Sequence, residues 1–233
     1  MRSSLWSALG NRYLVVEAEA GRSLDAPSAR TLVGDADGIV EVISSGPDQL
    51  DIVIWNPDGS RAELSGNGTR IAAAWFAEAT GARHITVRVG ARETRATVLA
   101  NGDIEQDLGE VHVGARETAA DVVFVPVTVG NPHAVVLGDP AEIERIGPLL
   151  ETHHRFPDRT NVQVARVDRP GEVTARVWER GVGETTSSGT SAVAVAAATH
   201  TTGDVLVHFP GGDLYVRLEG SRARLTGPAE RVG

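Results

Sequence analysis

Short runs of β-branched and other apolar residues recur along the 233-residue chain, where they alternate with Arg, Asp and Thr. This period of two predicts β-strands with one face toward a core and one toward water, most of them antiparallel. The predicted strands span residues 13–17, 38–43, 51–55, 85–89, 96–99, 122–129, 134–137, 162–167, 173–178, 205–209, 214–218 and 222–225.

Two Ala-rich segments, 67–80 and 193–199, interrupt this pattern and predict helices. Both are apolar around most of their circumference, and such helices need burial on several sides. A sheet curled around each helix would provide that burial. The remaining predictions are a weaker helix over 140–150 that begins at Asp139-Pro140, and C-terminal caps at Gly81 and Gly203.

Similar loops precede the two Ala-rich helices. Residues 63–70 are ELSGNGTR and residues 184–191 are ETTSSGTS. A helix that follows small residues offers N–H groups and the positive end of its dipole, which together bind anions. Each loop alone could be an ordinary cap with glycine for a tight turn. Two such loops in one chain favour two similar halves that face one ligand.

The order of elements is the same in both halves: strands, loop, buried helix, more strands. The predicted fold is therefore α+β, with two pseudo-symmetric halves, each a curled, mainly antiparallel sheet wrapped around a central apolar helix. The length allows two cores. The polar segment 109–120 lacks periodicity, so the predicted halves are 1–115, joined by the C-terminal residues 222–233, and 116–221.

Composition narrows the function classes. The net charge is −9 and the chain has no basic run, so we expect no nucleic-acid surface. No apolar run reaches the roughly 20 residues that span a bilayer, and the N-terminal segment lacks the apolar stretch of a signal peptide, so a cytoplasmic protein without membrane contact is expected. Cysteine is absent and the seven histidines are scattered, so neither disulfides nor a metal site is predicted.

The two loops suggest a specific chemistry. A ligand held by two helix N-termini would have its carboxylate bound by backbone N–H groups, with one side chain on each face of the adjacent carbon. That arrangement suits proton removal from one face and delivery to the other, which inverts a stereocentre. The N–H groups would stabilise the charge that develops as the α-proton leaves. This reaction on a small amino-acid substrate requires no cofactor.

Five segments, in this order along the chain, resemble motifs of the diaminopimelate epimerase family. They are residues 56–70 (NPDGSRAELSGNGTR), 130–135 (GNPHAV), 156–162 (FPDRTNV), 179–190 (ERGVGETTSSGT) and 227–230 (GPAE). The family's fold has two similar halves, each a curled sheet around a central helix. The resemblance also implies a step of lysine biosynthesis, the conversion of L,L- to meso-diaminopimelate, and allows a homodimer.

In the family, two cysteines act as base and acid on opposite faces of the α-carbon. Serine occupies both positions here, Ser65 and Ser188. A thiol has a pKa of about 8.5, which a helix N-terminus lowers, whereas a serine hydroxyl is a far weaker acid that needs an adjacent base. Epimerisation is therefore expected to be slow or absent unless His133, Glu179 or Glu184 takes over proton transfer.

The resemblance implies further site residues. His133 and Glu179 match the polar pair beside the catalytic thiols, and residues 10–13 (GNRY) resemble the family's N-terminal G-N-D-F. As turn chemistry alone, Asn56 before Pro57-Asp58-Gly59 would need no ligand. The implied substrate-binding residues are Asn11, Asn56, Gly66, Asn67, Asn131, Asn161, Arg180, Glu184, Gly189 and Thr190.

Three hypotheses remain at this stage. The chain is an epimerase whose two cysteines were replaced by serine, which would let it bind substrate without reacting. Alternatively, it is a natural family member with different chemistry, such as a racemase, isomerase or dehydratase of another amino acid. The third hypothesis is a non-catalytic amino-acid-binding protein.

Overall fold

The computed structural model describes residues 2–18, 22–62 and 65–232, so Glu63 and Leu64 of the first loop lie outside the described residues. The chain divides into two units. Unit 1 comprises Met1–Asp107 with Gly227–Gly233, and unit 2 comprises Leu108–Thr226. The divisions predicted from the sequence are at 115 and 222. Both divisions fall inside strands, where alternating apolar residues give no boundary signal.

Unit 1 is a mixed sheet with two parallel crossovers. Strands β1 and β2 are antiparallel, β2–β3 is parallel, β3–β4 antiparallel, β4–β5 parallel, and β5–β6 and β6–β7 antiparallel. Helix α1 lies in the first crossover and α2 in the second, and the short β18 pairs with β1. The bounds are β1 Ser3–Ala8, β2 Asn11–Glu17, α1 Ala26–Leu32, β3 Gly38–Ser45, β4 Gln49–Trp55, α2 Gly66–Thr80, β5 His84–Val89, β6 Arg92–Val98, β7 Ile104–Glu110 and β18 Glu230–Arg231.

Unit 2 repeats this series of pairings. Strands β10–β11 are antiparallel, β11–β12 parallel, β12–β13 antiparallel, β13–β15 parallel, and β15–β16 and β16–β17 antiparallel. The bounds are β8 His112–Val113, β9 Glu117–Ala119, β10 Val122–Thr128, β11 Pro132–Leu137, η1 Pro140–Glu142, α3 Ile143–Glu151, β12 Asn161–Arg169, β13 Glu172–Glu179, β14 Gly183–Thr185, α4 Gly189–Thr199, β15 Gly203–Phe209, β16 Gly212–Glu219 and β17 Arg222–Gly227.

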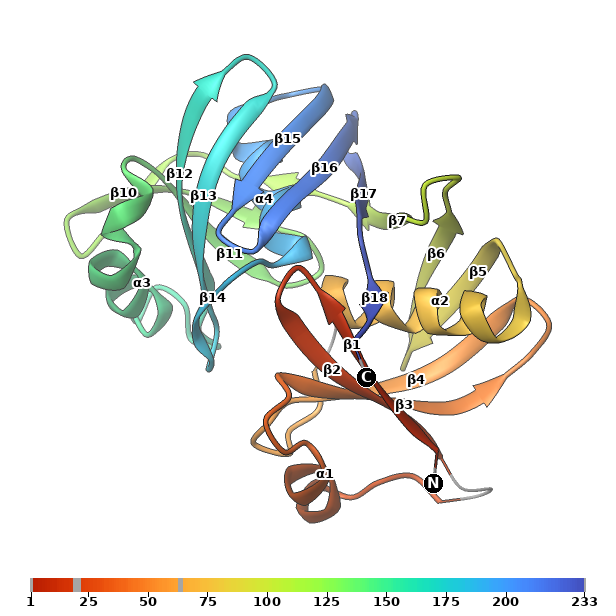
Figure 1. Cartoon of the computed structure of the whole chain (residues 1–233). Helices are drawn as coiled ribbons and strands as arrows, with labels where there is room; N and C mark the ends of the chain where they lie inside the picture. Colours follow the sequence, from red (N-terminus) through yellow and green to blue (C-terminus); the bar gives the residue numbers. More distant parts are fainter. Residues whose placement is uncertain (1, 19–21, 63–64, 233) are drawn as a thin grey trace. The chain divides into compact units, whose positions relative to one another are not determined.

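The two apolar helices form the centres of the two cores, with strands of their own unit around them (Figure 1). Helix α2 packs on β1, β2, β5 and β6, and its side chains are buried from Gly66 through Ala74. Helix α4 packs on β10 to β13, β15 and β16, and is buried from Gly189 through Ala196. These contacts confirm the predicted fold class, in which each half wraps a curled sheet around a central helix.

Several local predictions are corrected. Helix α4 begins at Gly189, four residues before the predicted start, because the Ser188 loop supplies its first turn. It ends at Thr199 on an extended His200, so Gly203 opens strand β15 and does not cap the helix. Gly81 caps α2 in the left-handed conformation, with φ 78°, as predicted.

Helix α1 and the two parallel pairs in each unit were not predicted. The Asp25 side chain caps α1 by accepting the N–H of Ser28, and an Asp before a proline in the first turn is a helix-start signal. The weak third helix is present as η1 followed by α3. Within the described ranges, no helix is long and apolar enough to cross a membrane.

Candidate functional site

Ser65 is the N-cap of α2. Its Oγ accepts a hydrogen bond from the backbone N–H of Gly68 at 3.0 Å, and its carbonyl accepts the N–H of Thr69 at 2.9 Å. The first N–H groups of a helix, here those of Gly66 and Asn67, have no carbonyl partner within the helix itself. A Cβ at position 68 would approach Ser65 Oγ to 3.3 Å, so glycine suits this tight first turn. The Ser65 hydroxyl thus lies at the positive end of a buried helix dipole.

Ser188 is the N-cap of α4, and its surroundings differ from those of Ser65. Its backbone carbonyl accepts the N–H of Ala192 at 2.9 Å, but its side chain makes no cap hydrogen bond. The residue is 3% exposed, and the Gly189 and Thr190 that follow are buried. The two serines therefore occupy equivalent helix positions with different hydrogen bonding.

A buried arginine joins the start of α2 to the C-terminal segment of unit 1. Arg70 Nε donates to the carbonyl of Pro228 at 3.0 Å, and Nη2 donates to Asn67 Oδ1 at 3.0 Å. Arg70 is fully buried, and this burial lowers its pKa to about 10. The GPAE segment that resembles the family's C-terminal motif therefore holds the side chain of Asn67 through Arg70.

His133 lies inside a polar network in unit 2. Gln163 Nε2 is 3.0 Å from His133 Nδ1 and 2.9 Å from Ser191 Oγ, and His133 Nε2 is 2.8 Å from Asn131 Oδ1. With Gln163 as donor to Nδ1, the imidazole carries its proton on Nε2 and donates to Asn131. In this orientation Gln163 Oε1 is buried without a hydrogen-bond partner. The opposite orientation would put the amide nitrogen in its place and leave two buried N–H groups unpaired, which is less favourable. The first orientation therefore holds, and with it the tautomer protonated on Nε2.

The burial of His133 limits its chemistry. The side chain is 1% exposed, and burial, assisted by the charge of Arg180, lowers its pKa to about 3. A neutral imidazole with both nitrogens bonded inside the protein is poorly suited to accept a proton from a substrate. The geometry favours a positioning role in which His133 fixes the amide of Asn131, whose Nδ2 lies 3.5 Å from Thr190 Oγ1 at the start of α4.

Asn161 also holds its neighbours through both ends of its amide. Its Nδ2 donates to the carbonyl of Pro132 at 3.0 Å, and its Oδ1 accepts the backbone N–H of Arg180 at 3.0 Å. Arg180 Nη1 donates to the carbonyl of Asp158 at 3.3 Å. Unit 2 thus brings together the predicted residues Asn131, His133, Asn161 and Arg180.

The two predicted carboxylates at the end of β13 and in β14 have different partners. Glu179 Oε1 accepts the hydroxyl of Thr185 at 2.6 Å. Glu184 forms a bidentate pair with Arg176, with Nε···Oε1 at 2.5 Å and Nη2···Oε2 at 2.6 Å. This strong pair occupies both oxygens of Glu184, so Glu184 is poorly placed to accept a proton.

The remaining predicted residues of unit 1 lie near strand ends. Asn11 is buried at the start of β2 and pairs with Ala8 of β1. Asn56 follows β4 and donates from Nδ2 to Ser60 Oγ at 2.9 Å, inside the turn that its sequence predicts. Within the described residues, no hydrogen bond joins the Asn56 side chain to the Ser65 loop.

Sequence reasoning missed two residues that contact this machinery, Gln163 and Tyr13. Tyr13 Oη lies 3.2 Å from Ser65 Oγ, across 52 residues of sequence. Gln163 could have been identified from the sequence, because it is a polar residue within the apolar strand β12. No comparable sequence signal marks Tyr13.

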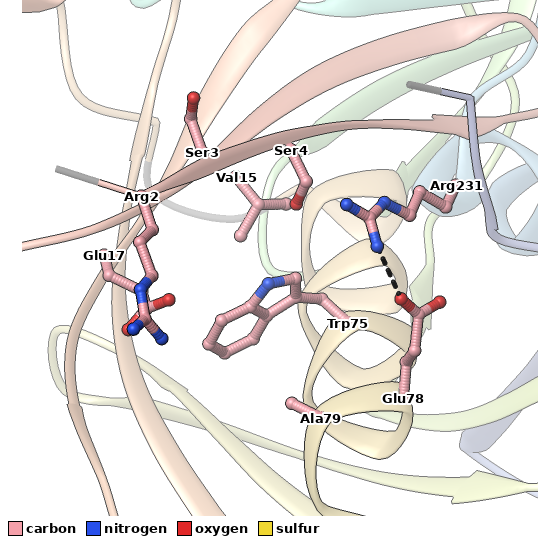
Figure 2. Close-up of a pocket in the computed structure, with 9 residues that line it drawn as sticks. All are labelled: Arg2, Ser3, Ser4, Val15, Glu17, Trp75, Glu78, Ala79 and Arg231. Carbon is pink, nitrogen blue, oxygen red and sulfur yellow. Dashed lines mark hydrogen bonds and ion pairs between the residues drawn. The ribbon is translucent and has the colours of Figure 1, made fainter.

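A separate cavity of about 420 Å³ lies near the C-terminal half of α2 (Figure 2). Trp75 lines it, as do Arg231 and Glu78, which form an ion pair at 3.0 Å. None of the candidate site residues lines this cavity. Trp75 is ten residues beyond the N-cap Ser65, which corresponds to about 15 Å along a helix.

Comparisons with known proteins agree with the motifs. A family model described as diaminopimelate epimerase matches residues 125–232. The diaminopimelate epimerase of Desulforudis audaxviator is 38% identical, with 96% of this chain and 94% of that protein covered. The diaminopimelate epimerase of Carboxydothermus hydrogenoformans is 33% identical, with the same coverage of 96% and 94%.

A solved structure shows the same fold at low sequence identity. A predicted epimerase from Pseudomonas aeruginosa superposes with a TM-score of 0.75 at 16% identity, with 100% of this chain and 97% of that chain covered. The sequence similarity to the curated relatives extends over nearly the whole chain. The chain therefore belongs to the diaminopimelate epimerase family of isomerases.

Proposed function

We propose that the chain is a cofactor-independent epimerase that acts on diaminopimelate and inverts one α-carbon of the L,L form to give the meso form. The observation that carries this proposal is the placement of Ser65 and Ser188, each as the N-cap of a buried apolar helix, one in each unit. Inversion by proton transfer needs one group on each face of the α-carbon, and the two units supply one hydroxyl each.

The backbone supports the same chemistry. In the proposed complex, the N–H groups of Gly66, Asn67, Gly189 and Thr190 bind the reacting carboxylate. They stabilise the negative charge that moves onto it when the Cα–H bond breaks, which lowers the barrier without a cofactor. The amides of Asn11, Asn56, Asn131 and Asn161, with Arg180, bind the distal amino-acid head group, where a guanidinium can pair with a carboxylate through two hydrogen bonds.

The two serines set the expected rate. A serine hydroxyl is a much weaker acid than a thiol, so removing the α-proton through it has a smaller driving force. His133 is neutral and enclosed, and Glu184 is paired with Arg176, so neither supplies the missing base. We therefore propose turnover that is slower than that of the same site with two cysteines.

The test is to incubate L,L-diaminopimelate with the chain in heavy water and to follow the α-proton signal by NMR. A Ser65→Cys, Ser188→Cys double variant serves as the comparison. Slow loss of the signal with the chain itself and faster loss with the variant supports the proposal. Loss only with the variant would indicate a binding protein that lacks the acid and base, and loss with neither would overturn the assignment of substrate.

A further inference from the structure

The hydroxyl of Ser65 has a neighbour that no motif predicts, the phenol of Tyr13. The two oxygens lie 3.2 Å apart, within hydrogen-bond distance. Ser65 Oγ already accepts the N–H of Gly68, which leaves its own proton free to be donated to the phenol oxygen. Tyr13 can thus act as acceptor toward Ser65 or, in the other direction, as donor.

The fold holds the Tyr13 ring in this position. Tyr13 lies in β2 between Trp6 of β1 and Gly38 of β3. A Cβ on Gly38 would come within 2.6 Å of the ring carbon Cε1, so the absence of a side chain at this position lets the ring lie against the strand. The phenol is half-buried, and its oxygen lies within hydrogen-bond distance of the N-cap of α2.

A phenol is a much stronger acid than the serine hydroxyl and can therefore take part in proton transfer where serine alone is poorly suited. Tyrosine has a reference pKa of about 10, close to that of a thiol and far below that of an aliphatic hydroxyl. The positive end of the α2 dipole favours the phenolate further. The side chain of Ser188, at the equivalent position of α4, makes no cap hydrogen bond.

We propose that Tyr13 is the acid–base partner of Ser65, so that the pair performs the proton transfer that a cysteine performs in a thiol-based site. The inference rests on the proposed function. The Cα–H bond of the substrate breaks, its electron pair stays on the α-carbon and the carboxylate, and the proton passes to Ser65 Oγ. At the same time the Ser65 hydroxyl proton passes to the Tyr13 phenolate. The reverse transfers return a proton to the same face.

The test compares Tyr13→Phe with Tyr215→Phe as the matched control. The chain contains two tyrosines, and Tyr215 is an exposed residue of β16. Because a positioned acid–base group contributes about 100-fold or more, Tyr13→Phe is expected to slow α-proton exchange of L,L-diaminopimelate in heavy water by at least that factor. Tyr215→Phe is expected to leave the rate unchanged.

Two further measurements separate proton transfer from a structural effect. The absorbance of tyrosinate, followed with pH in the wild type and in each variant, gives the titration of Tyr13 alone. The exchange rate of the wild type is expected to rise with pH along that titration and to lose this rise in Tyr13→Phe. In a Ser65→Cys, Ser188→Cys background, adding Tyr13→Phe is expected to cost little, since the thiol no longer needs the phenol.

The outcomes are distinguishable. Exchange by the wild type that Tyr13→Phe leaves intact would overturn the role of Tyr13 and keep the proposed function. Exchange only in cysteine variants would also overturn it, because the Ser65–Tyr13 pair would then move no proton. Exchange in no variant, including the one with two cysteines, would overturn the proposed function itself.

Discussion

The two N-cap serines are expected to contribute differently to the free energy of unfolding. The variants Ser65→Ala and Ser188→Ala test this, and each serves as the control for the other. Ser65→Ala removes the Oγ that accepts the N–H of Gly68 at 3.0 Å, so one donor of the first turn of α2 loses its partner. Replacing a capping serine by alanine costs about 1 kcal/mol. Ser188→Ala removes a hydroxyl that makes no cap hydrogen bond, so the expected change in the free energy of unfolding is below about 0.5 kcal/mol.

Urea denaturation followed by circular dichroism measures both variants against the wild type. For a chain of this size, 1 kcal/mol corresponds to a shift in Tm of about 2–4 °C, so a thermal scan resolves the pair as well. Equal losses for the two serines would refute the reasoning, because they would mean that the cap hydrogen bond of Ser65 adds nothing to the loss caused by removing its hydroxyl. A larger loss for Ser188→Ala would refute it more strongly.

The remaining predictions concern two buried side chains. Arg70→Ala removes the donor to the carbonyl of Pro228 and to Asn67 Oδ1, and leaving these acceptors unpaired is expected to lower the free energy of unfolding by about 1–3 kcal/mol. Urea denaturation measures the change, and an unchanged free energy of unfolding would contradict these two hydrogen bonds. Folding lowers the pKa of His133 from 6.5 to about 3, so between these pH values the unfolded chain binds a proton that the folded chain does not. The free energy of unfolding therefore falls by about 1.4 kcal/mol per pH unit as the pH is lowered from about 6.5 toward 3. His133→Gln is expected to reduce that slope in acid denaturation, and an unchanged slope would show that His133 protonates freely in the folded state.

The sequence predicts those strands, helices and caps that depend on local residue patterns. Alternation located most of the strands, and the Ala-rich composition located α2 and the greater part of α4, since a helix that is apolar all round has to be buried. The positive φ of Gly81 follows from its position after a helix. Helix α1 was missed because its seven residues carry only a cap and a proline signal.

Contacts between distant segments could not be predicted in this way. Tyr13 and Ser65 meet because β2 and the start of α2 are brought together by the sheet, and neither local sequence indicates the other. The role of His133 depends on Gln163, which the parallel pairing of β11 with β12 places beside it. The motif identifies His133 as a candidate residue. Its charge and its exposed fraction depend on the folded unit and cannot be read from the motif.

The most direct test of the central claim, that Ser65 and Ser188 occupy the positions of the two proton-transfer groups, is the stereochemistry of labelling by the Ser65→Cys, Ser188→Cys variant. L,L-diaminopimelate is supplied in heavy water, and the early product is separated from the remaining substrate and analysed by mass spectrometry. The account predicts meso product that carries one deuterium at the inverted carbon, and recovered substrate that carries none. Product without deuterium, or no meso product at all, would contradict it.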